Sequence, residues 1–203
     1  MIEALKKIDT ELFLFLNDKH NAVLDVIMFW VSQNFFWIPL YALFLFLILK
    51  KYRRNAATII VSVFVLFGLS DRFSVFLKNT FLRYRPCHNA DIEHFVHLVN
   101  GYCGGQYGFV SSHATNTFAL ATFLSFVFAN SPKPIFGQHK YFTILIFGWA
   151  SLISYSRIYL GQHYPADVVV GALLGICLGY IVVKVNFYVE KRISHKGTNS
   201  SYE

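Results

Sequence analysis

Uncharged apolar stretches alternate with polar segments along most of this chain. Five of them stand out, at residues 35–49, 56–69, 114–130, 141–155 and 168–183. Each is shorter than the roughly 20 residues that a helix needs to cross a bilayer, so flanking residues must complete the spans. The second stretch continues in this way to residue 77, across Asp71 and Arg72. The pattern predicts an all-α integral membrane protein, a bundle of five to six transmembrane helices.

The first 34 residues follow a different pattern. Within residues 1–20, apolar side chains recur near helical spacing between charged ones, which indicates an amphipathic helix at the membrane interface. Residues 22–33 are apolar but contain Asp25, so they form either a re-entrant segment or the start of the next span. We therefore divide the chain into three parts: an amphipathic or re-entrant segment (1–34), a membrane domain (35–190) and a polar cytoplasmic tail (191–203).

Composition and charge support this assignment. Hydrophobic residues make up 55% of the chain and charged residues only 14%, whereas soluble domains carry about 25% charged residues. The chain opens without the apolar run and small-residue cleavage pattern of a secretory signal peptide. Most of the net charge of +7 lies in clusters at residues 50–54, 133–140 and 184–196. These clusters follow alternate spans, which places them on the cytoplasmic side.

Several cations fall on the opposite, outer side and need another explanation. They are Arg72, Lys78, Arg83, Arg85 and Arg157. Taken singly, such residues also fit interfacial cations beside lipid headgroups. The lipid bilayer is the partner that the sequence indicates, and nothing in it points to nucleic acid or to an obligate protein partner.

A charged cluster between the last two apolar stretches carries the clearest chemistry. Arg157 can bind a phosphate in bidentate fashion, and His163 can act as a nucleophile or a base. Asp167 follows one helical turn later and can hold the imidazole tautomer. Such groups are costly beside a membrane span unless they have a function, although a lone loop histidine is by default structural.

Two further segments reach the same membrane face. Lys78 and Arg85 open the long outer loop and add two cations. Ser111 or Ser112 is suited to cap the helix that follows, where free backbone N–H groups form an anion site. His113 adds a second imidazole at that helix start.

Together these residues resemble the type 2 phosphatidic acid phosphatase family, which includes the vanadium haloperoxidases. Lys78 and Arg85-Pro86 have the family's K-x6-R-P spacing, and Ser156-Arg157, His163 and Asp167 have its S-R-x5-H-x3-D spacing. The P-S-G-H motif is altered, because residues 110–113 read Val-Ser-Ser-His. The resemblance covers about residues 56–185.

The resemblance implies metal-independent phosphoryl transfer through a phosphohistidine, without a cofactor. His163 would be the nucleophile, Asp167 its orienting partner, and His113 the general acid that protonates the leaving oxygen. The phosphate oxygens would be held by cations and hydroxyl groups, those of Lys78, Arg85, Arg157, Ser111 and Ser112.

From these expectations we predict a lipid phosphatase of the inner (cytoplasmic) membrane whose active site faces the periplasm. The N-terminal sequence is similar to that of small bacterial undecaprenyl-diphosphate phosphatases, which favours undecaprenyl diphosphate as the substrate. Phosphatidate, phosphatidylglycerol phosphate and lipid A 1-phosphate are the alternatives. A vanadate-dependent haloperoxidase is a more distant one, since those relatives are larger soluble proteins. A non-catalytic scaffold or transporter is the remaining class.

Two of the three cysteines, Cys87 and Cys103, share the long outer loop. They form a disulfide if the loop lies outside the cytoplasm, or else two unpaired thiols. The histidines of this loop are expected to be solvated, and no Cys/His spacing in the sequence resembles a zinc site.

Overall fold

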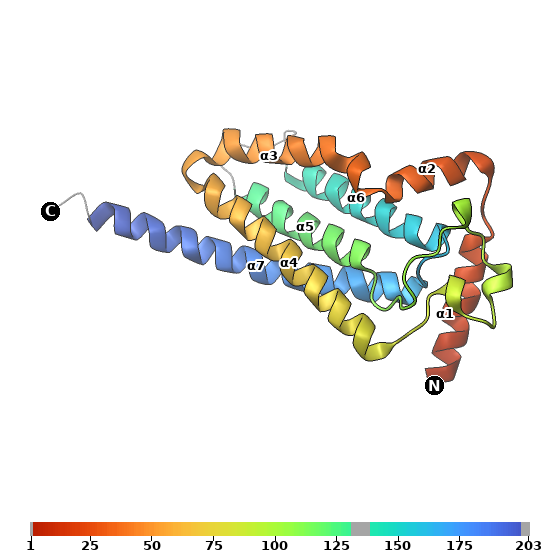
Figure 1. Ribbon diagram of the computed structural model, residues 1–203. Coiled ribbons are helices and arrows are strands. Elements are labelled where there is room, and N and C mark those ends of the chain that lie inside the picture. Colours follow the sequence, from red (N-terminus) through yellow and green to blue (C-terminus); the bar gives the residue numbers. More distant parts are fainter. Residues whose placement is uncertain (1, 131–138, 200–203) are drawn as a thin grey trace.

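The structure is a computed structural model that describes residues 2–130 and 139–199, and these ranges are almost entirely helical (Figure 1). In these ranges the α-helices are α1 (Ile2–Asn17), α2 (Ala22–Ser32), α3 (Ile38–Tyr52), α4 (Ala56–Phe81), α5 (Ser112–Ala129), α6 (His139–Tyr159) and α7 (Pro165–Asn199). Short 3-10 turns are η1 (Asn34–Trp37), η2 (Arg53–Asn55), η3 (Pro86–His88), η4 (Glu93–Phe95) and η5 (Val99–Gly101). The described residues contain no strand, which confirms the predicted all-α class.

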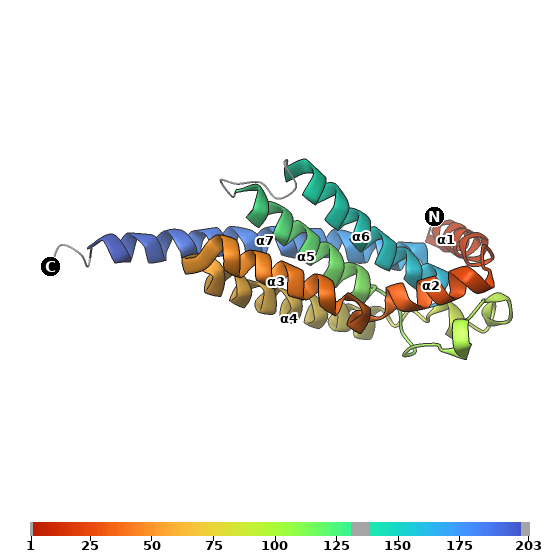
Figure 2. The same cartoon turned by 90° about the horizontal axis from the view of Figure 1, so that it is seen from above.

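Helices α3 to α7 run side by side and form the bundle (Figures 1 and 2). Among the described residues, three segments are long and apolar enough to cross a bilayer by length and composition: Asn34–Tyr52, Ala56–Phe81 and Pro165–Ser194. Helix α5 packs against α4, α6 and α7, and its buried positions include Thr115, Thr122 and Ser125. Because its neighbours shield it from lipid, α5 can carry small polar side chains that a lipid-facing helix avoids.

The closest contact in the bundle joins α5 to α7. Gly171, Gly175 and Gly179 recur every four residues and lie on one face of α7. A Cβ atom at Gly171 would lie 2.8 Å from the carbonyl oxygen of Ser111, and one at Gly179 would lie 2.5 Å from that of Ala119. Small residues at this spacing let two helix backbones approach closely. The contact fixes the start of α7 against the start of α5.

Helix α1 lies across one end of the bundle (Figures 1 and 2). Its side chains Leu5, Ile8 and Leu12 are exposed, as suits a helix that rests on the bilayer interface. Helix α2 has 11 residues and is therefore only about 16 Å long. Since the hydrocarbon core is about 30 Å thick, α2 does not cross it alone.

Two helices extend beyond the apolar runs that predict them. Helix α4 continues to Phe81 and α7 to Asn199, whereas the apolar runs end at residues 77 and 183. The outer loop therefore begins at residue 82, and the predicted polar tail is helical up to residue 199. Outside the bilayer, water can solvate these polar helix ends. Residues 200–203 of that tail and the predicted basic connection around Lys133 lie outside the described residues.

Candidate active site

The three motifs meet at the end of the bundle where α1 and the long loop lie (Figure 1). Lys78 belongs to the last turn of α4, and His113 to the first turn of α5. Arg157 belongs to the last turn of α6 and Asp167 to the first turn of α7. His163 occupies the turn between these two helices. The structure thus brings together residues that lie up to 89 positions apart in the sequence (167 − 78).

A tight turn places His163. Gly161 has a φ of +70°, a left-handed conformation that favours glycine. The backbone N–H groups of Gln162 and His163 both donate to the Arg157 carbonyl, at 3.0 and 3.2 Å. Tyr164 then precedes α7, and its N–H donates to Oδ2 of Asp167 at 3.0 Å. This bond is one half of a capping box, in which the side chain of the third helical residue accepts from the N–H of the residue before the helix, and it fixes the Asp167 carboxylate against the start of α7.

The His163 side chain is only 2% exposed. Its Nε2 lies 3.0 Å from NH1 of Arg85, and its Nδ1 lies 3.6 Å from Oδ2 of Asp167. The second distance is too long for a hydrogen bond, although the two groups are neighbours. Burial, together with the positive charges of Arg85, Arg157 and Lys78, lowers the pKa of His163 well below its usual value. The imidazole is therefore neutral near pH 7 and keeps a lone pair for nucleophilic attack.

Asp167 is completely buried and has a second partner, which is charged. NH1 of Arg83 donates to its Oδ1 at 2.8 Å. The sequence does not reveal this contact, although Arg83 is one of the cations on the outer side of the predicted spans. Gly108 packs between the two motifs, since a Cβ atom there would lie 3.2 Å from both Asp167 Oδ2 and Arg85 Cγ.

Both serines of the altered second motif form hydrogen bonds. Ser111 is fully buried, its hydroxyl accepts from Ala114 N at 3.5 Å, and its own N–H donates to the Asp167 carbonyl at 3.0 Å. The Ser112 hydroxyl lies 2.5 Å from Nζ of Lys78 and 2.8 Å from the Ser74 hydroxyl. Thus the side chain that replaces the usual glycine contacts the lysine expected to bind phosphate. Ser74 is a further contact that no sequence motif indicated.

Arg85 and Arg157 are held in different ways. Arg85 donates through Nε to the Gly105 carbonyl at 2.5 Å and through NH1 to the Gln162 carbonyl at 3.0 Å. Arg157 is only 8% exposed, and NH1 donates to the hydroxyl of Ser32 in α2. Among the described residues none accepts a hydrogen bond from Arg157 Nε. A buried guanidinium with an unused donor is suited to an incoming oxyanion.

Two cavities meet at this site. The first, of about 450 Å³, is lined by polar and aromatic groups, those of Phe29, Ser32, Gln33, Asn34, Asn100, Tyr102, His113 and Arg157. The second, of about 530 Å³, begins at Ser112 and His113 and extends along α3, α4 and α5. Apolar side chains line most of its length, among them Phe44, Ile48, Phe67 and Leu124. His113 and Asn34 border both cavities.

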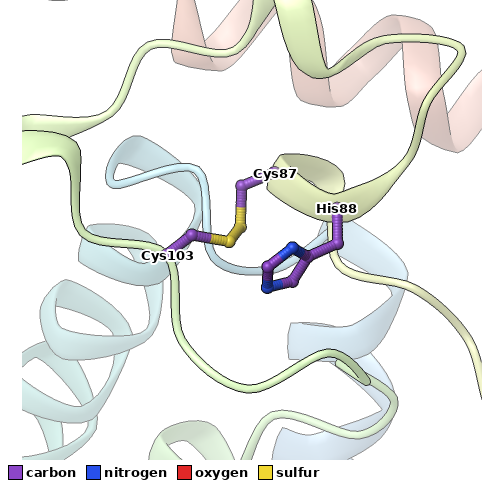
Figure 3. A group of neighbouring side chains, drawn as sticks. All are labelled: Cys87, His88 and Cys103. Carbon is purple, nitrogen blue, oxygen red and sulfur yellow. A yellow bond between two sulfur atoms is a disulfide. The ribbon is translucent and has the colours of Figure 1, made fainter.

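Cys87 and Cys103 are joined in a disulfide (Figure 3), which confirms the first of the two alternatives. His88 lies beside the bond, with Nε2 2.9 Å from the Gly104 carbonyl. In the described part of the chain these residues form the one group of three or more His, Cys, Asp and Glu side chains whose ligand atoms all lie within 4.8 Å of one another. Because both sulfurs are bonded to each other, neither is a thiolate ligand for a metal.

The sequence is similar to those of curated phosphatases. Two proteins named lipid A 4'-phosphatase are 35% and 37% identical to this chain, from Porphyromonas gingivalis and Bacteroides thetaiotaomicron respectively. The first alignment covers 94% of this chain and 78% of the relative, and the second covers 98% and 82%. A protein named undecaprenyl-diphosphatase from Sulfolobus acidocaldarius is 29% identical, over 87% of this chain and 78% of the relative.

The fold also matches a crystal structure, that of a transmembrane PAP2 type phosphatidylglycerolphosphate phosphatase from Bacillus subtilis. The TM-score is 0.72 over 92% of this chain and 88% of that one, with 19% sequence identity. Residues 56–191 match the PAP2 superfamily and include all three motifs. The chain therefore belongs to the PAP2 superfamily and is a membrane lipid phosphatase, a hydrolase of phosphoric esters.

Proposed function

We propose that the protein hydrolyses a phosphate monoester on the saccharide headgroup of a lipid of the lipid A type and so releases phosphate. The observation that carries this proposal is the meeting of a polar and an apolar cavity at His113. An amphiphile bound across this junction would place its tail along α3 to α5 and its headgroup in the polar cavity, with the phosphate between them. Lipid-binding sites combine apolar walls with a few convergent polar groups in this way.

The side chains that line the polar cavity favour binding of a sugar headgroup over binding of a phosphate alone. Gln33, Asn34 and Asn100 offer amide donors and acceptors, and Phe29 and Tyr102 offer aromatic surface. Amide groups can satisfy sugar hydroxyls in both directions, because each carries donors and an acceptor. The names of the two relatives at 35% and 37% identity agree with this substrate class. They favour the 4' position over the 1-phosphate expected as an alternative from the sequence.

Undecaprenyl diphosphate is the second candidate. The N-terminal sequence resemblance favours it, and so does the relative named undecaprenyl-diphosphatase. A polyprenyl chain would also fit the apolar cavity. The two candidates differ in the headgroup, since a diphosphate offers no sugar hydroxyls to the amide groups of the polar cavity.

For either substrate we propose the same two chemical steps. Nε2 of His163 attacks phosphorus, the bond to the leaving oxygen breaks, and His113 donates a proton to that oxygen. Water then attacks the phosphohistidine, His113 takes up the proton of the water, and phosphate and neutral His163 are released. Lys78, Arg85, Arg157, Ser111 and Ser112 would stabilise the phosphate oxygens, as preorganised charges and donors do. To free Nε2, Arg85 must transfer its hydrogen bond from the imidazole to a phosphate oxygen.

We place the site end of the bundle at the periplasmic face of the inner membrane. The cluster Lys50, Lys51 and Arg53 lies at the end of α3 that is remote from the site (Figure 1). Positive residues of this kind favour the cytoplasmic side. The disulfide supports the same orientation, because disulfides persist in oxidising compartments.

The test is phosphate release by the purified protein in detergent micelles. The panel is hexa-acylated bis-phosphorylated lipid A, undecaprenyl diphosphate, phosphatidate and phosphatidylglycerol phosphate, and mass spectrometry of the lipid A product identifies the phosphate removed. We expect fastest release from the 4' position of lipid A, nearly complete loss in His163→Ala, and no loss on addition of EDTA. Faster release from undecaprenyl diphosphate would favour the second candidate. Release from none of the lipids would refute the proposed function.

A further inference from the structure

A chain of salt bridges leads from Asp167 to the N-terminal helix, through two residues outside the three motifs. NH1 of Arg83 binds Oδ1 of Asp167 at 2.8 Å, and NH2 binds Oδ2 of Asp9 in α1 at 2.6 Å. The other oxygen of Asp9 accepts from the N–H of Ala166 at 2.8 Å. Asp9 therefore holds both the arginine that binds Asp167 and the backbone immediately before Asp167.

Both terminal nitrogens of Arg83 are engaged by these carboxylates. Its guanidinium lies 4.1 Å from the centre of the Tyr164 ring, so the ring covers one face while the two carboxylates take the two ends. Arg157, by contrast, keeps a free Nε donor within the described structure. The two arginines are therefore suited to different tasks, Arg157 to an incoming oxyanion and Arg83 to holding Asp167.

Helix α1 is docked against the catalytic turn along one face. Asp9, Phe13 and Asn17 recur every four residues and so share that face. Phe13 is buried, with its ring centre 5.4 Å from that of Tyr164. Nδ2 of Asn17 donates to the Tyr159 carbonyl at 2.7 Å. The helix thus contacts the chain just before and just after His163, while Leu5, Ile8 and Leu12 stay exposed.

We propose that Asp9 and Arg83 are positioning residues of the phosphatase, which hold the Asp167 carboxylate in the orientation that steers His163. The inference rests on the phosphohistidine step of the proposed function. Oδ2 of Asp167 lies 3.6 Å from Nδ1 of His163, so a small movement of either group makes or loses a hydrogen bond. When Nε2 attacks phosphorus, the imidazole becomes cationic and the carboxylate stabilises it.

Asp9 also sets the charge at this point. The group of Asp9, Arg83 and Asp167 contains two carboxylates and one guanidinium, so the ionised group as a whole carries one net negative charge. Without Asp9, the charge of Arg83 would cancel that of Asp167 and the guanidinium would be free to turn. Both changes weaken the stabilisation of the cationic imidazole.

The decisive variant is Asp9→Asn, which keeps an oxygen for Ala166 N but removes the charge facing Arg83. We expect kcat to fall roughly tenfold to a hundredfold, the size of effect that a slight misplacement of a catalytic group produces. KM should stay unchanged, because Asp9 lines neither of the two cavities proposed for the substrate, and Asp9→Glu should retain most of kcat. Glu11→Gln is the matched control, since Glu11 is an exposed residue of the same helix whose carboxylate lies 3.9 Å from Lys7.

Turnover must be measured per folded protein, with the fold checked by size exclusion and circular dichroism. A lower thermal midpoint with unchanged kcat would show a merely structural role and overturn the proposal, as would a rise in KM at constant kcat. If Asp9→Asn does not fold, Arg83→Lys decides, because a lysine cannot bridge two carboxylates as the guanidinium fork does. Full kcat in that variant overturns the proposal. A wild-type protein that releases phosphate from none of the lipids in the panel would instead refute the proposed function.

Discussion

Arg85 donates a hydrogen bond to His163, with NH1 and Nε2 3.0 Å apart. An arginine has donors only, so the Nε2 atom must be the acceptor and the proton of the neutral ring belongs to Nδ1. This tautomer directs the Nδ1 proton towards Asp167 and the Nε2 lone pair towards Arg85, one of the cations proposed to bind phosphate. The arrangement is the one that attack through Nε2 requires.

Arg85→Lys tests the importance of this contact. Lysine keeps the positive charge but loses the planar fork that contacts Gly105, Gln162 and His163 together. We expect kcat/KM to fall about a hundredfold, comparable to the loss of one preorganised oxyanion donor. Steady-state phosphate release measures it. The control is Arg72→Lys, an exposed cation of α4, and an equal loss in that variant would contradict the specific role of Arg85.

The titration of His163 gives a prediction on pH. Burial and the charges of Arg85, Arg157 and Lys78 lower its pKa, so the ring stays neutral when the pH falls below the usual value of about 6.5. We expect the NMR signal of His163, assigned by its loss in His163→Gln, to titrate well below that pH. Arg85→Gln removes one of the charges and should move the midpoint upward. A wild-type midpoint at or above the ordinary value would contradict the buried, cation-flanked site.

Gly175→Ala should destabilise the bundle. A Cβ atom at this position would overlap the carbonyl oxygen of Thr115 in α5, and backbone cannot move aside as a flexible side chain can. We expect a loss of about 1–3 kcal/mol, as in other cases of overpacking, together with reduced activity. Thermal unfolding in detergent measures it. Gly68→Ala is the control, because beyond the adjoining backbone of α4 no atom lies within 4 Å of a Cβ there, and it should be neutral or slightly stabilising.

Removal of the disulfide should loosen the outer loop. Cys87 and Cys103 are 16 positions apart, and closing a loop of that size contributes about 3 kcal/mol in the chain-entropy description. The closed segment adjoins Gly105, whose carbonyl holds Arg85. We therefore expect Cys87→Ser/Cys103→Ser to inactivate at a lower temperature than the wild type, and dithiothreitol to lower the wild-type midpoint in the same way. Cys177→Ser should have no effect; equal midpoints in all variants would contradict the prediction.

The three motifs were predictable because their chemistry depends on short spacings. His163 and Asp167 lie one helical turn apart, and the alternation of spans sends Lys78 and His113 to the same membrane face. The contributions of Asp9 and Ser74 were not predictable, because they depend on contacts between distant segments. Nothing local in the sequence pairs residue 9 with residues 83 and 166. The ends of α4 and α7 were also missed, since an apolar run marks the part of a helix in the bilayer and not where its hydrogen bonds stop.

The altered Val-Ser-Ser-His motif was predictable in its position but not in its contacts. Its serine and histidine were correctly placed at the start of α5 from sequence. What the extra hydroxyl of Ser112 does could not be read from the motif, since its partners Lys78 and Ser74 belong to another helix.

One backbone hydrogen bond, from the Ser111 N–H to the Asp167 carbonyl, ties α5, which carries the proposed general acid His113, to α7, which follows the proposed nucleophile His163. Close glycine packing continues this attachment along α5 and α7. The two histidines are thus held on one rigid unit and do not depend on the substrate to bring them together. The entropy cost of aligning acid and nucleophile is met once, when the bundle folds, and is absent from each turnover.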